Sequence, residues 1–257
     1  MSMKKLMIAA CGVLVVTLST RAEEPKNGIM SAEIVGYASN NLRWGSIGLV
    51  PQFAGVASAD GSFDLQTITC SDNSSDSVSF SVLNNTGLNG DSYLWVNWYD
   101  PDEDGETESC WVNDEFEKVT DYTLKPGEAL WVQADSTDQL FQSAGRVNTS
   151  DVAVQLRSGS TLTGNPFPVT LDLQDITCSD NCSDSVSFSI LNNTGLNGDS
   201  YLWIDYYENP QTGETESCWV NDEFEKVKDF KVTPGMGLWV QADHSDQYIT
   251  FPGVELN

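Results

Sequence analysis

The chain contains nearly the same sequence twice, and this duplication constrains its fold more than any other feature. The segment GETESCWVNDEFEKV begins at Gly105 and again at Gly213, which is an offset of 108 residues. At this offset the match extends over residues 63–135 and 171–243. A period of this length is too long for one unit of a solenoid and has the size of a small domain. We therefore expect two copies of one module.

Within each copy the apolar residues recur with a period of two, which is typical of strands that bury one face. Residues 77–82 alternate polar and apolar side chains, and residues 93–99 are rich in the aromatic and β-branched types that favour strands. The sequence predicts an all-β fold of two tandem antiparallel β-sandwich or jelly-roll-like domains. We place module one at residues 29–144 and module two at 145–257, and residues 143–146 form the expected linker.

The beginnings of the two modules match less closely. Residues 42–46 (LRWGS) resemble residues 156–160 (LRSGS), and this alignment requires about six additional residues in module one. We expect these segments to occupy equivalent positions. A short linker between like modules favours a fixed arrangement over independent motion.

Residues 1–22 have the pattern of a cleaved secretory signal peptide. Lys4 and Lys5 precede an apolar run at residues 6–18, and small residues follow. That run, about 13 residues, is too short to span a bilayer as a helix. A second interpretation is lipoprotein processing at Cys11. In either case we expect bacterial-type export to the periplasm, the extracellular space or the cell surface, without membrane insertion of the mature chain.

The charge of the chain excludes one large class of partners. Its formal net charge is -26, and its isoelectric point is about 4.1. Such a surface repels phosphate backbones, so we expect no nucleic-acid binding. It repels anionic lipid as well and attracts cations.

The cysteines follow the duplication. Five of them lie beyond the predicted signal peptide: Cys70, Cys110, Cys178, Cys182 and Cys218. The same spacing separates Cys70 from Cys110 and Cys178 from Cys218. Because exported proteins meet an oxidising environment, we expect one disulfide per module, Cys70–Cys110 and Cys178–Cys218.

Cys182 has no counterpart in module one, where Ser74 occupies the equivalent position. It is therefore the odd thiol of the set. Three fates remain open: a free thiol, intermolecular pairing with another chain, or competition with Cys178 for Cys218.

One short motif supports a family resemblance. Residues 124–132 read LKPGEALWV, and residues 232–240 read VTPGMGLWV with a departure at the first position. These segments resemble an L-x-P-G-x-x-x-W-V motif of repeat domains in uncharacterised exported bacterial proteins. The resemblance implies an exported β-domain of surface or interaction type and supplies no catalytic residues.

Residues 100–108 (DPDEDGETE) suggest a calcium loop in module one. Asp100, Asp102 and Asp104 stand at alternate positions before a glycine, as in the first half of a D-x-D-x-D-G loop. In this interpretation Glu106 adds its carbonyl oxygen, and Glu108 binds directly or through water. The twelfth position of the loop is a tryptophan, and module two lacks the three aspartates. The alternative is an acidic hairpin tip without a metal.

The strand expected at residues 93–99 has two chemically different faces. Leu94, Val96 and Trp98 form one face, which we expect in the core because it is largely aliphatic. The other face mixes aromatic rings with amide or carboxylate groups, as sugar-binding platforms do. The candidate ligand-binding residues are Tyr93, Trp95 and Trp131 with their copies Tyr201, Trp203 and Trp239. The alternative is that both faces are covered by protein.

The sequence gives little support for catalysis, although its many carboxylates leave an enzyme with a glycosidase-type acid pair open as a third interpretation. The only histidine, His244, aligns with Ser136, and no hydrolase, metalloprotease or phosphate-loop motif is present. We expect an exported, non-catalytic structural, adhesive or surface-interaction protein whose partner is a surface glycan or another protein. The alternative is a carbohydrate-binding protein that uses an outward aromatic platform in each module.

Overall fold

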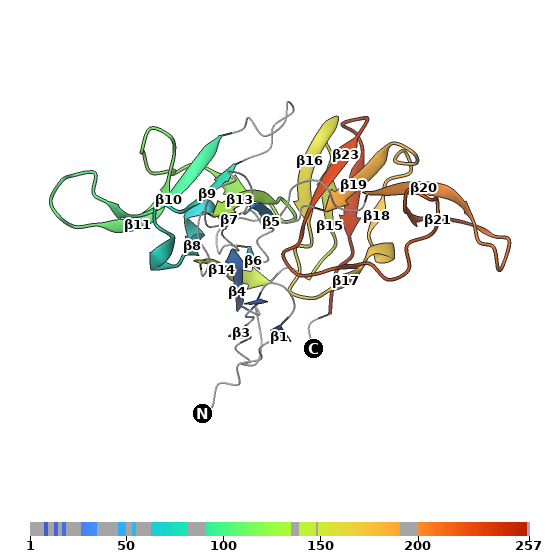
Figure 1. Ribbon diagram of the computed structural model, residues 1–257, viewed down its shortest axis with the longest axis horizontal. Helices are drawn as coiled ribbons and strands as arrows, with labels where there is room; N and C mark the ends of the chain where they lie inside the picture. The colour runs from blue at the N-terminus through green and yellow to red at the C-terminus, as the bar shows by residue number, and fades with distance from the viewer. Residues whose placement is uncertain are drawn as a thin grey trace.

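The structure, a computed structural model, describes residues 63–81, 91–134, 139–147, 149–190 and 200–255 together with six strands before residue 63. Every strand pairing in these parts of the chain is antiparallel, and the predicted all-β fold is confirmed (Figure 1). No helix in the described part is long and apolar enough to cross a bilayer.

The strands before residue 148 are β1 (Ile8–Ala9), β2 (Val13–Leu14), β3 (Thr17–Leu18), β4 (Asn27–Ile34), β5 (Ser46–Leu49), β6 (Phe53–Ala54), β7 (Phe63–Asp64), β8 (Ile68–Cys70), β9 (Val78–Ser81), β10 (Ser92–Tyr99), β11 (Glu108–Val112), β12 (Thr123–Leu124), β13 (Leu130–Ala134) and β14 (Gln139–Val147). Those after it are β15 (Val152–Gln155), β16 (Gly159–Gly164), β17 (Leu171–Asp172), β18 (Thr177–Cys178), β19 (Val186–Ile190), β20 (Ser200–Glu208), β21 (Thr215–Val220), β22 (Lys231–Val232), β23 (Gly237–Ala242) and β24 (Tyr248–Phe251). Three short 3-10 turns lie at Leu65–Thr67, Asp72–Ser74 and Leu173–Asp175.

The two modules build their larger sheet in the same order. In module one it is β11-β10-β9-β13-β5, and in module two it is β21-β20-β19-β23-β16. Leu130 of β13 pairs with Leu49 of β5, and the equivalent Leu238 of β23 pairs with Thr163 of β16. This shared register confirms the weaker match at the module starts, with its six additional residues in module one.

A second set of strands covers one face of each large sheet. In module one β14 pairs with β4, β6 and β8, and in module two β24 pairs with β15 and β18. Trp111 and Trp219 are completely buried in the separate core clusters of the two modules. Their indole N–H groups donate to the carbonyls of Ile68 at 2.9 Å and Ile176 at 2.7 Å. These bonds satisfy the only polar atom of a large apolar ring.

A glutamine braces each core at the same place. In module two the Gln174 side-chain amide donates to the carbonyls of Trp219 at 3.0 Å and Val227 at 2.7 Å. Its oxygen accepts the backbone N–H of Trp219 at 3.1 Å. Gln66 makes the same three contacts in module one. The brace ties the turn after β17 to β21 and to the segment that follows it.

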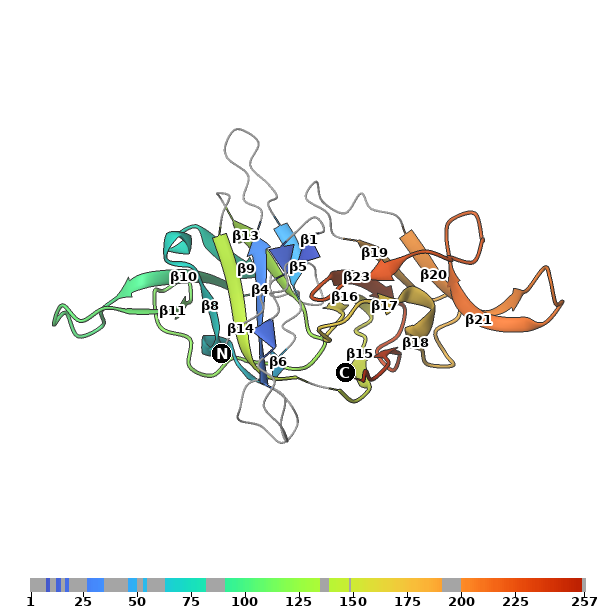
Figure 2. The ribbon, with the colours of Figure 1, turned by 90° about the horizontal axis from the view of Figure 1, so that it is seen from below.

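The modules contact each other through equivalent strands. The rings of Trp131 in β13 and Trp239 in β23 meet edge to face, with centroids 5.9 Å apart. The Thr163 hydroxyl donates to the Gly127 carbonyl at 2.7 Å in a buried position, and the Ala129 N–H donates to the Leu162 carbonyl at 3.3 Å. The hairpins β10–β11 and β20–β21 project from opposite ends of the molecule (Figures 1 and 2).

The predicted linker at residues 143–146 is not a linker, because it lies inside β14. Strand β14 pairs with β4 along most of its length and with β6 at its end. The connection between the modules therefore follows Val147. Strands β1 to β3 fall within the predicted signal segment. Cys11 lies outside the described residues.

The predicted disulfides are also wrong, since all five described cysteines are free thiols. Cys70 lies in the main core of module one, whereas Cys110 packs with Val96 and Val112 in a separate small cluster. Strand alternation explains the separation: Trp111 points into the main core, so its neighbour Cys110 points to the opposite face. Module two repeats the arrangement, with Cys218 in an equivalent small cluster. Neither predicted partner faces the other.

Candidate functional site

The six aromatic residues predicted as an outward platform are all in the interior. None is more than 8 % exposed: Tyr93, Trp95, Trp131, Tyr201, Trp203 and Trp239. In module one the Tyr93 ring packs on Phe80 at 4.8 Å, and the Trp95 ring packs on Trp111 at 5.3 Å. The alternative that both faces are covered therefore describes these positions correctly.

A β-bulge reverses the facing of the side chains at the end of β10. Val96 pairs with Cys110 and Tyr99 with Glu108, so two residues, Asn97 and Trp98, oppose one residue of β11. After the bulge Tyr99 joins the small cluster of Val96, and Trp98 turns outward with 46 % of its surface exposed. Bulges re-aim a side chain in this way and occur frequently beside functional sites.

Module two has the same bulge in β20. Ile204 pairs with Cys218 and Tyr207 with Glu216, and Tyr206 is 50 % exposed. The outward ring is therefore a tryptophan in one module and a tyrosine in the other, at equivalent positions.

A carboxylate holds each outward ring by its polar atom. The Trp98 indole N–H donates to Asp76 Oδ2 at 3.0 Å, and the Tyr206 hydroxyl donates to Asp184 Oδ1 at 2.7 Å. Asp76 and Asp184 both have a left-handed backbone with φ 61°. The bond to Asp184 raises the pKa of the Tyr206 hydroxyl, which keeps it a proton donor. These bonds orient the rings while both side chains stay exposed.

A second aromatic residue is exposed in the loop after the hairpin. Phe116 is 52 % exposed and its copy Phe224 is 57 % exposed. Each has φ 59°, a conformation that is unusual for a bulky residue and costs roughly 1–3 kcal/mol. The Asn113 side-chain oxygen stabilises the first loop by accepting the N–H groups of Glu115 at 3.0 Å and Glu117 at 2.8 Å.

The two exposed rings of module one lie together. The centroids of Trp98 and Phe116 are 6.0 Å apart, and the ring planes are inclined by 31°. We call Trp98 with Phe116 the first aromatic tip and Tyr206 with Phe224 the second aromatic tip. Each tip offers exposed ring surface beside carboxylate groups, with one ring near the end of β10 or β20 and the other in the loop after β11 or β21. Such a surface is suited to binding a ligand.

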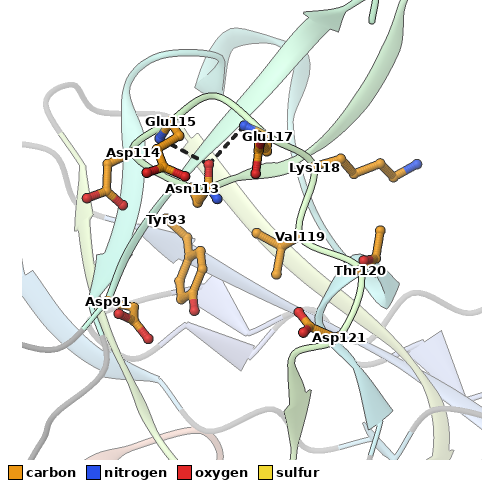
Figure 3. A pocket seen from close by; sticks show the side chains of 10 residues that line it. All are labelled: Asp91, Tyr93, Asn113, Asp114, Glu115, Glu117, Lys118, Val119, Thr120 and Asp121. Atoms are coloured by element: carbon orange, nitrogen blue, oxygen red, sulfur yellow. Dashed lines mark hydrogen bonds between the residues drawn. The ribbon is translucent and has the colours of Figure 1, made fainter.

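Beside the first tip is an acidic hollow of about 530 Å³. It is lined by Asp91, Tyr93, Asn113, Asp114, Glu115, Glu117, Lys118, Val119, Thr120 and Asp121 (Figure 3). The Tyr93 ring stands between Asp91 and Asp121. Burial and then the charges of these two carboxylates raise the pKa of Tyr93 to about 12. Lys118 is the only positively charged lining residue, and Glu108 neutralises it at 2.7 Å. The hollow therefore attracts cations.

The predicted calcium loop closes on itself in the structure. The Asp100 carboxylate accepts the backbone N–H of Asp104 at 3.2 Å and of Gly105 at 2.9 Å. Asp104 in turn accepts the N–H of Glu106 at 2.9 Å. In the described part of the chain no three acidic, histidine or cysteine side chains are grouped as metal ligands. Asp102 and Glu108 are exposed, and Glu108 is bound to Lys118. Calcium binding stays a prediction.

Comparison with protein-family models, with curated proteins and with solved structures gives no match to this chain. The candidate site therefore rests on its own chemistry. The prediction that Trp98 lies in the core with Leu94 and Val96 is wrong, since the bulge turns it outward. Phe116, Tyr206 and Phe224 were not selected from the sequence as binding residues. The available signal was the identical NDEFE segment in both copies, in which a phenylalanine stands among acids. An apolar ring in such surroundings has no neighbouring apolar residue to suggest burial.

Proposed function

We propose that this chain is an exported, non-catalytic adhesive protein that binds surface ligands through its two aromatic tips. The observation that carries the proposal is the repetition of an exposed phenylalanine in a strained left-handed turn, Phe116 and Phe224. Glycine would adopt that backbone without strain. A strained residue that also exposes apolar surface favours a role in contact with a partner over a role in folding.

The proposal treats the chain as two tandem sandwich domains that hold their tips apart. The first tip is formed by β10 and the loop after β11, and the second by β20 and the loop after β21. These two hairpins project from opposite ends of the molecule, and the Trp131–Trp239 contact lies between the modules (Figure 2). A rigid molecule with one site at each end cannot easily place both sites on one small ligand. It can instead link two ligands on separate surfaces, and each link gains from the other through effective concentration.

Carbohydrate binding is the second candidate, and the ring–carboxylate pairs favour it. A pyranose packs its apolar face on an aromatic ring, and its hydroxyls bond to neighbouring polar groups. Trp98 with Asp76 supplies both elements, as does Tyr206 with Asp184. This candidate moves the predicted sugar platform from the buried rings to the exposed ones.

Fluorescently labelled protein applied to fixed bacterial cells and to fixed erythrocytes tests adhesion, and a glycan array tests the sugar candidate. We expect saturable binding to at least one cell surface and agglutination of the cells by the unmodified chain. A glycan signal in addition identifies the ligand as a sugar. Absence of saturable binding to both cell types and to the array contradicts the proposal.

Variants of one tip separate binding from linking. Trp98→Ser with Phe116→Gly disables the first tip, and Tyr206→Ser with Phe224→Gly disables the second. Each single-tip variant should still bind cells but should no longer agglutinate them, while the variant with four substitutions should do neither. Equal agglutination by all of these proteins would show that contact is made elsewhere on the surface.

A further inference from the structure

Two cysteines lie side by side in module two. Cys178 ends β18 opposite Ile249 of β24. Cys182 is completely buried, and its sulfur lies 3.7 Å from the carbonyl oxygen of Tyr248, the neighbour of Ile249. The two thiols lie within hydrogen-bonding reach of each other, and their contact acts on the pKa of both. Both cysteines therefore lie against the same part of β24.

A tight turn returns the chain from Cys178 to Cys182. The Cys182 N–H donates to the Ser179 carbonyl at 2.9 Å, and the Ser179 N–H donates to the Tyr248 carbonyl at 3.0 Å. The Ser179 hydroxyl lies 3.2 Å from the Cys182 sulfur. The contact with Cys178 is the main cause that lowers the pKa of Cys182 to about 6, whereas burial and the same contact raise the pKa of Cys178. A thiolate is the form that attacks a disulfide.

We propose that Cys178 and Cys182 form an intramolecular disulfide in module two. This disulfide replaces the Cys178–Cys218 bridge that the sequence spacing suggested. The oxidant is an external disulfide, either a small molecule such as oxidised glutathione or a disulfide-exchange protein. Cys178, the more exposed thiol, first loses its proton to water and then attacks this disulfide, and one external thiolate leaves and is protonated to a thiol. The Cys182 sulfur then attacks the Cys178 sulfur of the mixed disulfide and releases the second. Two protein thiols are oxidised to one disulfide, and one external disulfide is reduced to two thiols.

Module one supplies the internal comparison. Ser74 replaces Cys182 there, is also completely buried, and lies 2.8 Å from the Ser71 hydroxyl. The turn is therefore the same with a hydroxyl in place of the thiol. It follows that only module two is closed by this bond, and that Cys70, Cys110 and Cys218 remain thiols.

The test is peptide mapping of the full-length protein after equilibration with reduced and oxidised glutathione. The protein is quenched in acid, unfolded, alkylated, digested and measured by mass spectrometry. We expect the peptide with Cys178 and Cys182 to lack both alkyl groups and to be lighter by two hydrogens. The other three cysteines should be alkylated. Alkylation of Cys178 and Cys182, or a link between Cys178 and Cys218, overturns the proposal.

Two exchanges between the modules serve as matched variants. Cys182→Ser installs the residue that module one tolerates, so the protein should fold, with unchanged circular dichroism, and lose the link. Ser74→Cys should create a link from Cys70 to residue 74 under the same conditions. If the folded S74C protein is fully alkylated at both positions, the turn does not favour disulfide formation and the argument from geometry fails.

Discussion

Replacing Gly127 by alanine tests whether the modules dock as the structure describes. Gly127 has φ +82°, and a Cβ added there would lie 2.7 Å from Val154 Cγ2 and 3.1 Å from Val152 Cγ1. Both valines belong to β15 of module two and are buried. Because β-branched side chains have one preferred rotamer in most settings, they cannot easily move away. The substitution therefore brings backbone strain and a steric clash together.

The chain offers controls for the strain alone. Gly105 has φ +86° and Gly213 has φ +71°, and an added Cβ at either position meets nothing within 4 Å. Left-handed backbone costs a non-glycine residue about 1–2 kcal/mol, so Gly105→Ala and Gly213→Ala should destabilise by that amount. Overpacking adds about 1–3 kcal/mol. Gly127→Ala should therefore lower the free energy of unfolding by about 2–5 kcal/mol.

Urea unfolding followed by tryptophan fluorescence measures the three free energies, and small-angle scattering reports whether the modules stay together. A clash that is relieved by separation of the modules would appear as an increased radius of gyration. If Gly127→Ala is no more destabilising than Gly105→Ala and the scattering is unchanged, Val152 and Val154 do not lie against Gly127. The docking, and with it the opposed placement of the two tips, would then be wrong.

Three further substitutions have defined outcomes. Phe116→Gly should leave the protein as stable as before, or more stable by about 1 kcal/mol from relief of strain, while cell binding falls; lower stability with unchanged binding would assign Phe116 to folding. Gln174→Ala should lower the free energy of unfolding in urea by about 3 kcal/mol, because three hydrogen bonds are lost at about 1 kcal/mol each. As a control, Gln241→Ala at an exposed position should change that free energy by no more than about 0.5 kcal/mol. Calorimetric calcium titration should give one site per chain that Asp100→Ala abolishes, and an unmodified protein that takes up no calcium would contradict the loop hypothesis.

The duplication and the period of two were sufficient to predict the class of fold. Alternation at residues 77–82 corresponds to β9, and the aromatic run at 93–99 lies within β10. Alternation also contained the evidence against the disulfides. Trp111 and Cys110 are neighbours in one strand, so burial of the Trp111 ring in the main core turns Cys110 to the other face. Equal spacing of cysteines in sequence carried no information about their direction.

The aromatic tips were beyond prediction for a physical reason. A bulge inserts one residue, so every side chain after it changes face. Regular alternation would place Trp98 on the face of Val96, but after the bulge Tyr99 takes that place in the small cluster and Trp98 is exposed. The two residues of the bulge are Asn97 and Trp98, so no glycine in the sequence indicates where the bulge lies. The bulge is instead supported from outside the strand, where the Asn97 N–H donates to Ser75 Oγ at 3.0 Å.

The burial of Trp131 and Trp239 could not be predicted without knowing how the two modules contact each other. These two residues are equivalent, so their contact joins a residue to its own copy. A contact of this kind is the basic element of a twofold-symmetric interface, in which the same patch is used on both sides. Such an interface turns equivalent features in opposite directions, and the hairpins of the two modules accordingly leave the molecule at opposite ends. Duplication within one chain therefore fixes the separation of the two aromatic tips, which two unlinked modules would maintain only at concentrations where they associate.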